Sequence, residues 1–275
     1  MMKKLSSRLL LTLLGLGVTA LFAFPVYLML TTSFKSTQEY FVSPLGLPPR
    51  ITFENYAQAW TGSNFPRILL NSLLITAVSV LLVVIFASLA SYPLARYKNK
   101  LSGLLYIFFV AGLMLPFQSG LIALVCQVKD MGLLNTYTGA ILVYAGTQIP
   151  FPVFLFTGYI KSLPKELDES AEMDGCNQFQ LFWKIIFPMM KPVIATSVII
   201  TSLNIWNDFL VNYLLISSGD KRTLPAMSFI FFGKYNTNWG YGFAMLVLSM
   251  LPLIILFLFL QKYIIKGMTA GAIKG

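Results

Sequence analysis

Residues 69–91 read LLNSLLITAVSVLLVVIFASLAS, an uncharged stretch that decides the fold class. A helix of about 20 mostly apolar residues crosses the ~30 Å hydrocarbon core of a bilayer. Because no water is present there, the backbone hydrogen bonds of such a segment must lie within its own helix. The stretch therefore predicts a membrane-spanning helix.

Further apolar runs of similar length occur on both sides of this stretch. They cover residues 9–31, 104–126, 138–160, 192–216 and 241–265. Together with 69–91 they predict an all-α, polytopic membrane protein with six transmembrane helices in a single domain, 1–275. Prolines within these runs favour kinked, closely packed helices; they are Pro25, Pro116, Pro150, Pro152 and Pro252.

The composition excludes several classes of protein. The chain is 57% apolar and 11% charged, with mean hydropathy +0.74, which leaves too little polar surface for an ordinary soluble enzyme. It contains no His and two distant cysteines, Cys126 and Cys176, so we expect free thiols and no metal site. The net charge of +10 comes from short clusters beside the apolar runs, which argues against nucleic-acid binding.

The loop charges predict the orientation of the spans. With the N-terminus in the cytoplasm, thirteen Lys and Arg lie inside and seven outside, as the positive-inside rule favours. Both termini are then cytoplasmic. The first run follows basic residues as a signal peptide would, but it is long for one and lacks a clear cleavage site, so we interpret it as a retained helix.

Residues 161–191 form a polar inner loop that a simple bundle does not need. The loop holds five of the ten acidic residues. Pro164 favours the start of a helix over Lys165–Met173, and Gly175 favours its end. Apolar residues from Phe179 to Phe187 then predict a second helix. Two interpretations stay open: a protruding element whose exposed apolar surface docks on another protein, or a helix lying flat on the membrane.

The same loop carries a recognisable motif. Glu169-Ser170-Ala171, three residues, Gly175, nine residues and Ile185-Ile186-Phe187-Pro188 resemble the EAA motif of binding-protein-dependent ABC importer permeases. Ser170 and Phe187 depart from the pattern, whereas its spacing is kept. The 206–209 and 223–225 stretches and the glycine-rich end, 267–275, are similar to carbohydrate-uptake permeases of the maltose and multiple-sugar type.

The resemblance, which runs over essentially the whole chain, implies the type I ABC importer permease fold in a bacterial cell membrane. It implies a sugar substrate, an oligosaccharide by expectation, and a heterodimer with a second permease subunit. Two cytoplasmic ATPase subunits, which bind ATP and Mg, and an extracytoplasmic solute-binding protein complete the assembly. This chain is then no enzyme and holds no cofactor. The residues implied in ATPase coupling are Glu169, Ser170, Ala171, Asp174, Gly175, Ile185 and Pro188.

The fifth run also predicts a substrate pathway. Asn204, Asn207, Asp208 and Asn212 share one face of a continuous helix. Facing them to lipid is costly, so we expect a cavity where they bond sugar hydroxyls, with Gln118 and Gln148 as further candidates. Structural contacts between helices are the alternative. A rival function is ion-coupled secondary transport, for which Asp208 is the sole intramembrane carboxylate candidate.

Overall fold

The computed structural model describes the backbone of residues 2–231 and 238–272 and the side chains of 11–230 and 238–259. The described chain is helical throughout, which confirms the predicted all-α class. It divides into two compact units, Met1–Ile68 with Met227–Pro252 and Leu69–Ala226 with Leu253–Gly275. Each unit is described by itself.

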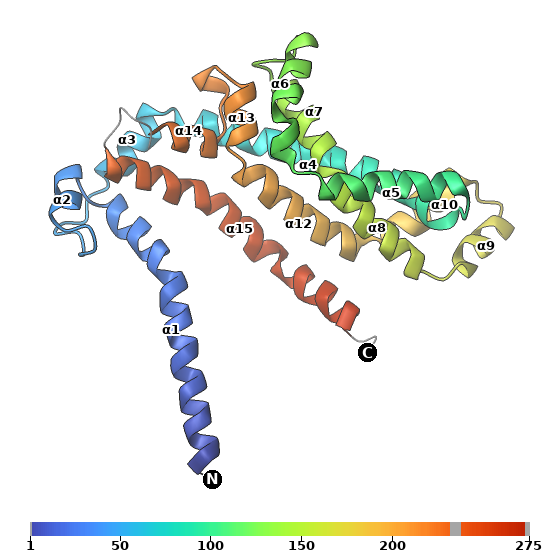
Figure 1. Cartoon of the computed structure of the whole chain (residues 1–275), viewed down its shortest axis with the longest axis horizontal. Helices are drawn as coiled ribbons and strands as arrows, with labels where there is room; N and C mark the ends of the chain where they lie inside the picture. The colour runs from blue at the N-terminus through green and yellow to red at the C-terminus, as the bar shows by residue number, and fades with distance from the viewer. Residues whose placement is uncertain (1, 232–237, 273–275) are drawn as a thin grey trace. The chain divides into compact units, whose positions relative to one another are not determined.

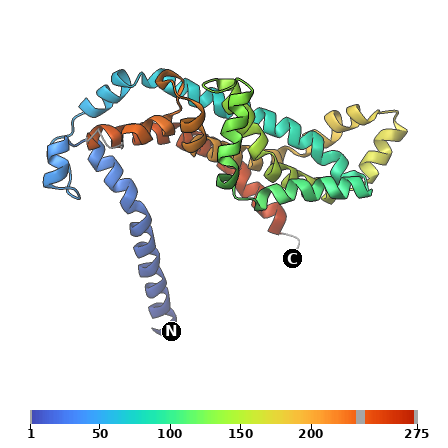
Figure 2. The same cartoon turned by 45° about the horizontal axis from the view of Figure 1, so that its top comes forward.

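Six candidate spans are present if each bent helix pair counts as one. Three are single long helices: α1 (Met2–Ser33), α4 (Phe65–Arg96) and α15 (Trp239–Ala272) (Figure 1). Helix α1 is continuous in both views (Figures 1 and 2), although Pro25 lies inside it. Pro252 likewise lies within α15 without ending it.

The other three spans are bent pairs, where the sequence predicts single helices. Helices α5 (Lys100–Met114) and α6 (Leu121–Asp130) meet at 95° across the 3-10 turn η1 (Phe117–Gly120). Helices α7 (Tyr137–Gln148) and α8 (Pro150–Ser162) meet at 44°. A proline stands at each break. Leu115, before Pro116, is extended (ψ 126°), as proline favours in the preceding residue. Ile149, before Pro150, keeps helical angles, and the missing N–H of the proline weakens the helix there.

The third bent pair leads from the inner loop into the fifth span at 73°. Its first half comprises α10 (Gln178–Leu181), the π-helical turn η2 (Phe182–Ile186) and α11 (Phe187–Met189). Its second half is α12 (Lys191–Asn207). Helix α9 (Glu166–Met173) precedes the pair, and α13 (Leu210–Leu215), η3 (Gly219–Lys221) and α14 (Leu224–Phe231) follow it.

The first unit includes α1, α2 (Thr37–Val42), α3 (Glu54–Gly62) and part of α15. The amide of Asn55 donates to the carbonyls of Ser33 and Lys35, both at 2.9 Å. A Cβ at Gly240 would lie 2.1 Å from the Lys35 carbonyl oxygen, so only glycine fits there. These contacts join the end of α1 to α3 and to the start of α15.

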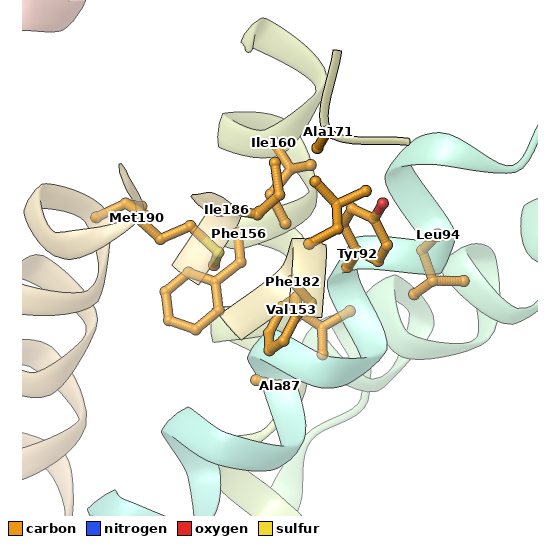
Figure 3. Close-up of a cluster of buried hydrophobic side chains, with 12 residues drawn as sticks. Ala87, Tyr92, Leu94, Val153, Phe156, Ile160, Ala171, Phe182, Ile186 and Met190 are labelled. Atoms are coloured by element: carbon orange, nitrogen blue, oxygen red, sulfur yellow. The ribbon is translucent and has the colours of Figure 1, made fainter. Parts of the chain in front are cut away.

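The second unit holds two apolar clusters. One gathers side chains from α4, α8, α9, η2 and α12 (Figure 3). The other gathers side chains from α4, α6, α7, α12 and α13. Helices α4 and α12 contribute to both clusters and so connect them within this unit.

Candidate functional site

Helix α9 carries the acidic residues of the 161–191 segment and ends in a glycine turn. Glu166, Asp168 and Glu169 lie in its first turn, where negative charge suits the helix dipole. At its end the N–H of Cys176 donates to Ala171 and that of Gly175 to Glu172, both at 3.0 Å. Gly175 has φ +79°, the left-handed conformation that this pair of hydrogen bonds requires, which confirms the predicted turn.

The next helix starts immediately and is tied back to α9. Asn177 caps α10 through a reciprocal pair of bonds with Gln180, at 2.8 and 3.1 Å. The Gln178 side chain donates to Glu172 of α9 at 2.8 Å and accepts from the Tyr92 hydroxyl of α4 at 3.3 Å. The two helices and α4 are therefore joined by one chain of hydrogen bonds.

Arg96, the last residue of α4, holds the start of the segment. Its Nε lies 2.5 Å from Oδ2 of Asp168, and both side chains are largely buried, 7% and 15% exposed. Its other nitrogens donate to the carbonyls of Leu163 and Pro164 at 3.1 and 3.4 Å. From the sequence, Arg96 is one of the thirteen basic residues of the inner side, and its place just after a long apolar run is the signal that it lies at the end of a span.

Burial raises the pKa of Asp168 above its ordinary value, and the neighbouring Arg96 and Lys165 charges act in the opposite direction. Asp168 is thus an acid whose charge depends on its cationic partners. A buried carboxylate without its partner is costly, so the pair fixes α9 at one position against α4.

The apolar half of the segment packs inward, and this corrects the expected exposed apolar surface. Leu181, Phe182 and Ile186 are at most 3% exposed and belong to one cluster with Phe156 and Ile160 of α8. Figure 3 shows Phe182 and Ile186 beside these α8 side chains. The reason is that α10 and η2 have their own spans to pack on. Leu181, Phe182 and Ile186 attach the segment to the membrane helices and are not available to an outside partner.

The motif residues divide between the buried and the outer side of the segment. Ala171 is 3% exposed and packs in the first cluster. Ile185 is half-buried beside that cluster. The outward side is formed by exposed residues, namely Glu169, Ser170, Asp174, Gly175 and Pro188, together with Met173 and Phe179.

The fifth span is broken inside the predicted polar stripe. Helix α12 ends at Asn207, and Asp208 is extended (φ −74°, ψ 120°). Oδ1 of Asp208 accepts the N–H of Val211 at 2.8 Å and the hydroxyl of Tyr144 at 3.0 Å. The four polar residues therefore do not continue along one helix, because the Asp208 carboxylate holds the start of a separate helix, α13.

The six candidate pathway residues fall into distinct settings. Asn204 donates to Oε1 of Gln148 at 3.2 Å, so the structure brings these two together. Asn212 is fully buried, and its Oδ1 accepts the N–H of Thr223 at 3.0 Å. Asn207 and Gln118 are exposed, on α12 and in η1. Within the described residues no cluster of acidic and cysteine side chains suits a metal ion.

A family model for the binding-protein-dependent transport system inner membrane component matches residues 83–270, more than half of the chain. The chain belongs to this family. The permease is a multi-pass membrane protein and a transport component rather than an enzyme, and permease subunits bind no cofactor of their own. Membership decides against ion-coupled secondary transport and confirms the resemblance drawn from the EAA-like motif.

Relatives match the permease over nearly its full length. The probable starch degradation products transport system permease protein AmyC of Thermoanaerobacterium thermosulfurigenes is 37% identical over 265 residues, covering 96% of each chain. The melibiose/raffinose/stachyose import permease protein MelC of Bacillus subtilis (strain 168) has the same identity and coverage. A chain of a bacterial ABC transporter that imports the acidic polysaccharide alginate superposes with TM-score 0.81 at 22% identity, covering 94% of this chain and 96% of that one, which supports the fold.

Proposed function

We propose that the permease is one of two related membrane subunits of an ATP-driven importer of oligosaccharides. Its partners are a second permease subunit, two cytoplasmic ATPase subunits and an extracytoplasmic solute-binding protein, and both of its termini are cytoplasmic. The observation that carries the substrate class is the full-length similarity to permeases of starch degradation products and of melibiose, raffinose and stachyose.

In this proposal the 161–191 segment couples ATP hydrolysis to movement of the spans. Glu169, Ser170 and Asp174 are exposed and form the face for an ATPase subunit. Ala171 and the Arg96–Asp168 pair attach the other face of α9 to the spans. A force on α9 therefore reaches α4 and α8 through packed contacts. Gly175, Ile185 and Pro188 position the two helices of the segment.

The pathway assignment follows the exposure of the polar side chains. Asn204 with Gln148, Asn207 and Gln118 offer amides that can both donate to and accept from sugar hydroxyls. Asp208 and Asn212 use their side-chain oxygens to accept hydrogen bonds from backbone N–H groups at and after the break in the fifth span. They are therefore assigned to holding the break rather than to contacting the sugar.

Reconstitution tests the assembly. Liposomes that contain the complete transporter and its loaded binding protein should accumulate labelled oligosaccharide with ATP inside, whereas the permease alone should not. Uptake by the permease alone, or equal uptake without the ATPase subunits, contradicts the proposal. Cysteine accessibility from the outside, with substitutions at Lys129 and Lys184, tests the predicted orientation.

Paired substitutions test the pathway. Asn204→Leu and Gln148→Leu should each lower the uptake rate, and the double variant should fall no further than the worse single variant if the two act together. Leu203→Met is the matched control, because Leu203 is an exposed apolar neighbour on α12. Unchanged uptake in the double variant, with normal complex yield, removes Asn204 and Gln148 from the pathway.

A further inference from the structure

A pocket of about 420 Å³ lies where α4 and α8 end and α5 begins, beside the turn that leads into α9. Its charged lining residues are Arg96, Lys98, Lys161 and Lys165. All charged side chains among the described lining residues are therefore basic. Arg96 is already paired with the Asp168 carboxylate, which does not line the pocket.

The lysines keep their charge available to a ligand. Lys98, Lys161 and Lys165 are exposed, so the pocket leaves their ammonium groups in contact with solvent. The Nζ of Lys161 lies 4.7 Å from the centre of the Tyr106 ring, which also lines the pocket. This cation–π contact fixes the direction of one ammonium group without neutralising it.

The floor of the pocket is the first turn of α5. Asn99 caps this fifteen-residue helix by accepting the N–H of Ser102 at 2.7 Å, and both residues line the pocket. The positive end of the helix dipole therefore adds to the lysine charges. A Cβ at Gly103 would meet nothing within 4 Å, so the wall is open at that position.

A pocket of this charge suits an anionic ligand, and its position indicates where that ligand comes from. The candidate span Phe65–Arg96 ends at it, the bent span of α5 and α6 begins at Lys100, and the bent span of α7 and α8 ends at Ser162. Three span ends place it at the depth of the lipid headgroups. Basic pockets between membrane helices on the cytoplasmic side bind acidic lipid headgroups.

We propose that this pocket binds the headgroup phosphate of an anionic phospholipid, with Lys98 and Lys161 as its principal contacts. Arg96 and Lys165 line the same pocket and also act on Asp168 of α9. A bound phosphate balances the positive charge beside the Arg96–Asp168 pair and supports the turn at 163–165. Lipid binding thereby regulates how firmly α9 is held, an effect that rests on the proposed coupling role.

Lipid retention tests the binding directly. The full-length permease, purified with its accompanying subunits in nanodiscs of phosphatidylglycerol and phosphatidylcholine, is released from them and its retained lipids are counted by native mass spectrometry. Lys98→Gln with Lys161→Gln should lower retained phosphatidylglycerol roughly 25-fold, because each lysine near an anionic surface contributes a factor of about five. Gly103→Leu should lower it by filling the pocket while keeping every charge.

Lys100→Gln is the matched control. Lys100 is the first residue of α5, is exposed and does not line the pocket, so retention should stay at the parent level. An equal loss in this variant would show general attraction to the surface and overturn the proposal. Unchanged retention in the double variant and in Gly103→Leu would also overturn it.

Excess inorganic phosphate separates the two sources of the anion. Phosphatidylglycerol should remain bound in its presence if the acyl chains contribute to the site. Displacement of the lipid by phosphate would assign the pocket to a soluble anion and overturn the lipid assignment. Lipid retention can be measured without ATPase activity. A failure of the lipid proposal is therefore seen in the retained lipid, whereas a failure of the proposed coupling role is seen in co-purification of the ATPase.

Discussion

Two segments flank α12, and they differ in how their backbones are held. The 161–191 segment is attached mainly by apolar side chains that pack on α4 and α8. The 208–224 segment packs α13 in the second cluster, and polar side chains from α4 also bond its backbone: Asn71 donates to the carbonyls of Asp220 and Arg222 at 2.9 and 3.0 Å. The Oγ of Ser72 accepts the N–H of Leu224 at 2.8 Å.

The difference follows from the backbone of each segment. The 161–191 segment is mostly helical, so its backbone is satisfied internally and its side chains are available for packing. The 208–224 segment has only short helices, and its free backbone groups need side-chain partners. The helical segment keeps polar side chains exposed on its outer face. The irregular segment uses its polar side chains as hydrogen-bond partners for its own backbone.

The largest loss of stability should come from breaking the ion pair between Arg96 and Asp168. Arg96→Met leaves Asp168 largely buried and unpaired, which should destabilise the permease by about 3 kcal/mol. We expect a lower thermal midpoint in detergent and faster proteolysis near α9. Adding Asp168→Leu should recover most of the loss. If Arg96→Met unfolds like the parent, the segment is held by packing alone.

Next in size is the loss of a backbone acceptor in the 208–224 segment. Asn212→Leu leaves the buried N–H of Thr223 without its partner, at a cost of about 1–3 kcal/mol. Asn207→Leu is the matched control at an exposed site and should stay within about 0.5 kcal/mol. Thermal unfolding of the two variants side by side measures the difference, and equal midpoints would contradict it.

A smaller effect should come from the turn between α9 and α10. Gly175→Val forces a β-branched residue into φ +79°, at a cost of about 1–2 kcal/mol. No atom lies within 4 Å of the added Cβ, so the strain is purely conformational. Gly175→Asn should therefore lose less, because asparagine tolerates this conformation. Identical thermal midpoints for Val and Asn would show that the turn relaxes freely.

The smallest effect on stability should come from the free face of α9. Glu169→Lys changes an exposed residue and should alter the free energy of unfolding by no more than about 0.5 kcal/mol. The proposed ATPase contact should nevertheless weaken through the reversed charge. Co-purification of the ATPase reports this, with Glu166→Lys as an exposed control outside the motif. Wild-type stoichiometry in Glu169→Lys would remove that residue from the contact.

The sequence predicted the features that depend on local chemistry. Long apolar runs predict six spans, and the described residues hold up to six candidates if each bent pair counts as one. Gly175 predicts the turn, because a left-handed residue after a helix favours glycine. The breaks at Pro116 and Pro150 were foreseen only as kinks. A proline marks where a helix is weakened, but Pro25 and Pro252 show that a helix can continue through it.

What the sequence could not predict depends on contacts between distant residues. Leu181, Phe182 and Ile186 form an apolar stripe that fits an outside partner or the chain's own spans equally well. The pairing of Arg96 with Asp168 joins residues 72 positions apart. The prediction of one continuous polar face on the fifth span is wrong for the same reason: Asp208 lies outside the helix and accepts a hydrogen bond from Tyr144 of α7.

Helix α4 has a mechanical consequence. Between Asn71, which anchors the 208–224 segment, and Tyr92, which contacts the α9–α10 pair, it runs without a break or a proline. At 1.5 Å per residue this distance is about 32 Å. A helix resists compression along its axis. The 161–191 and 208–224 segments are therefore attached to opposite ends of one rigid helix, which transmits an axial displacement from either end to the other.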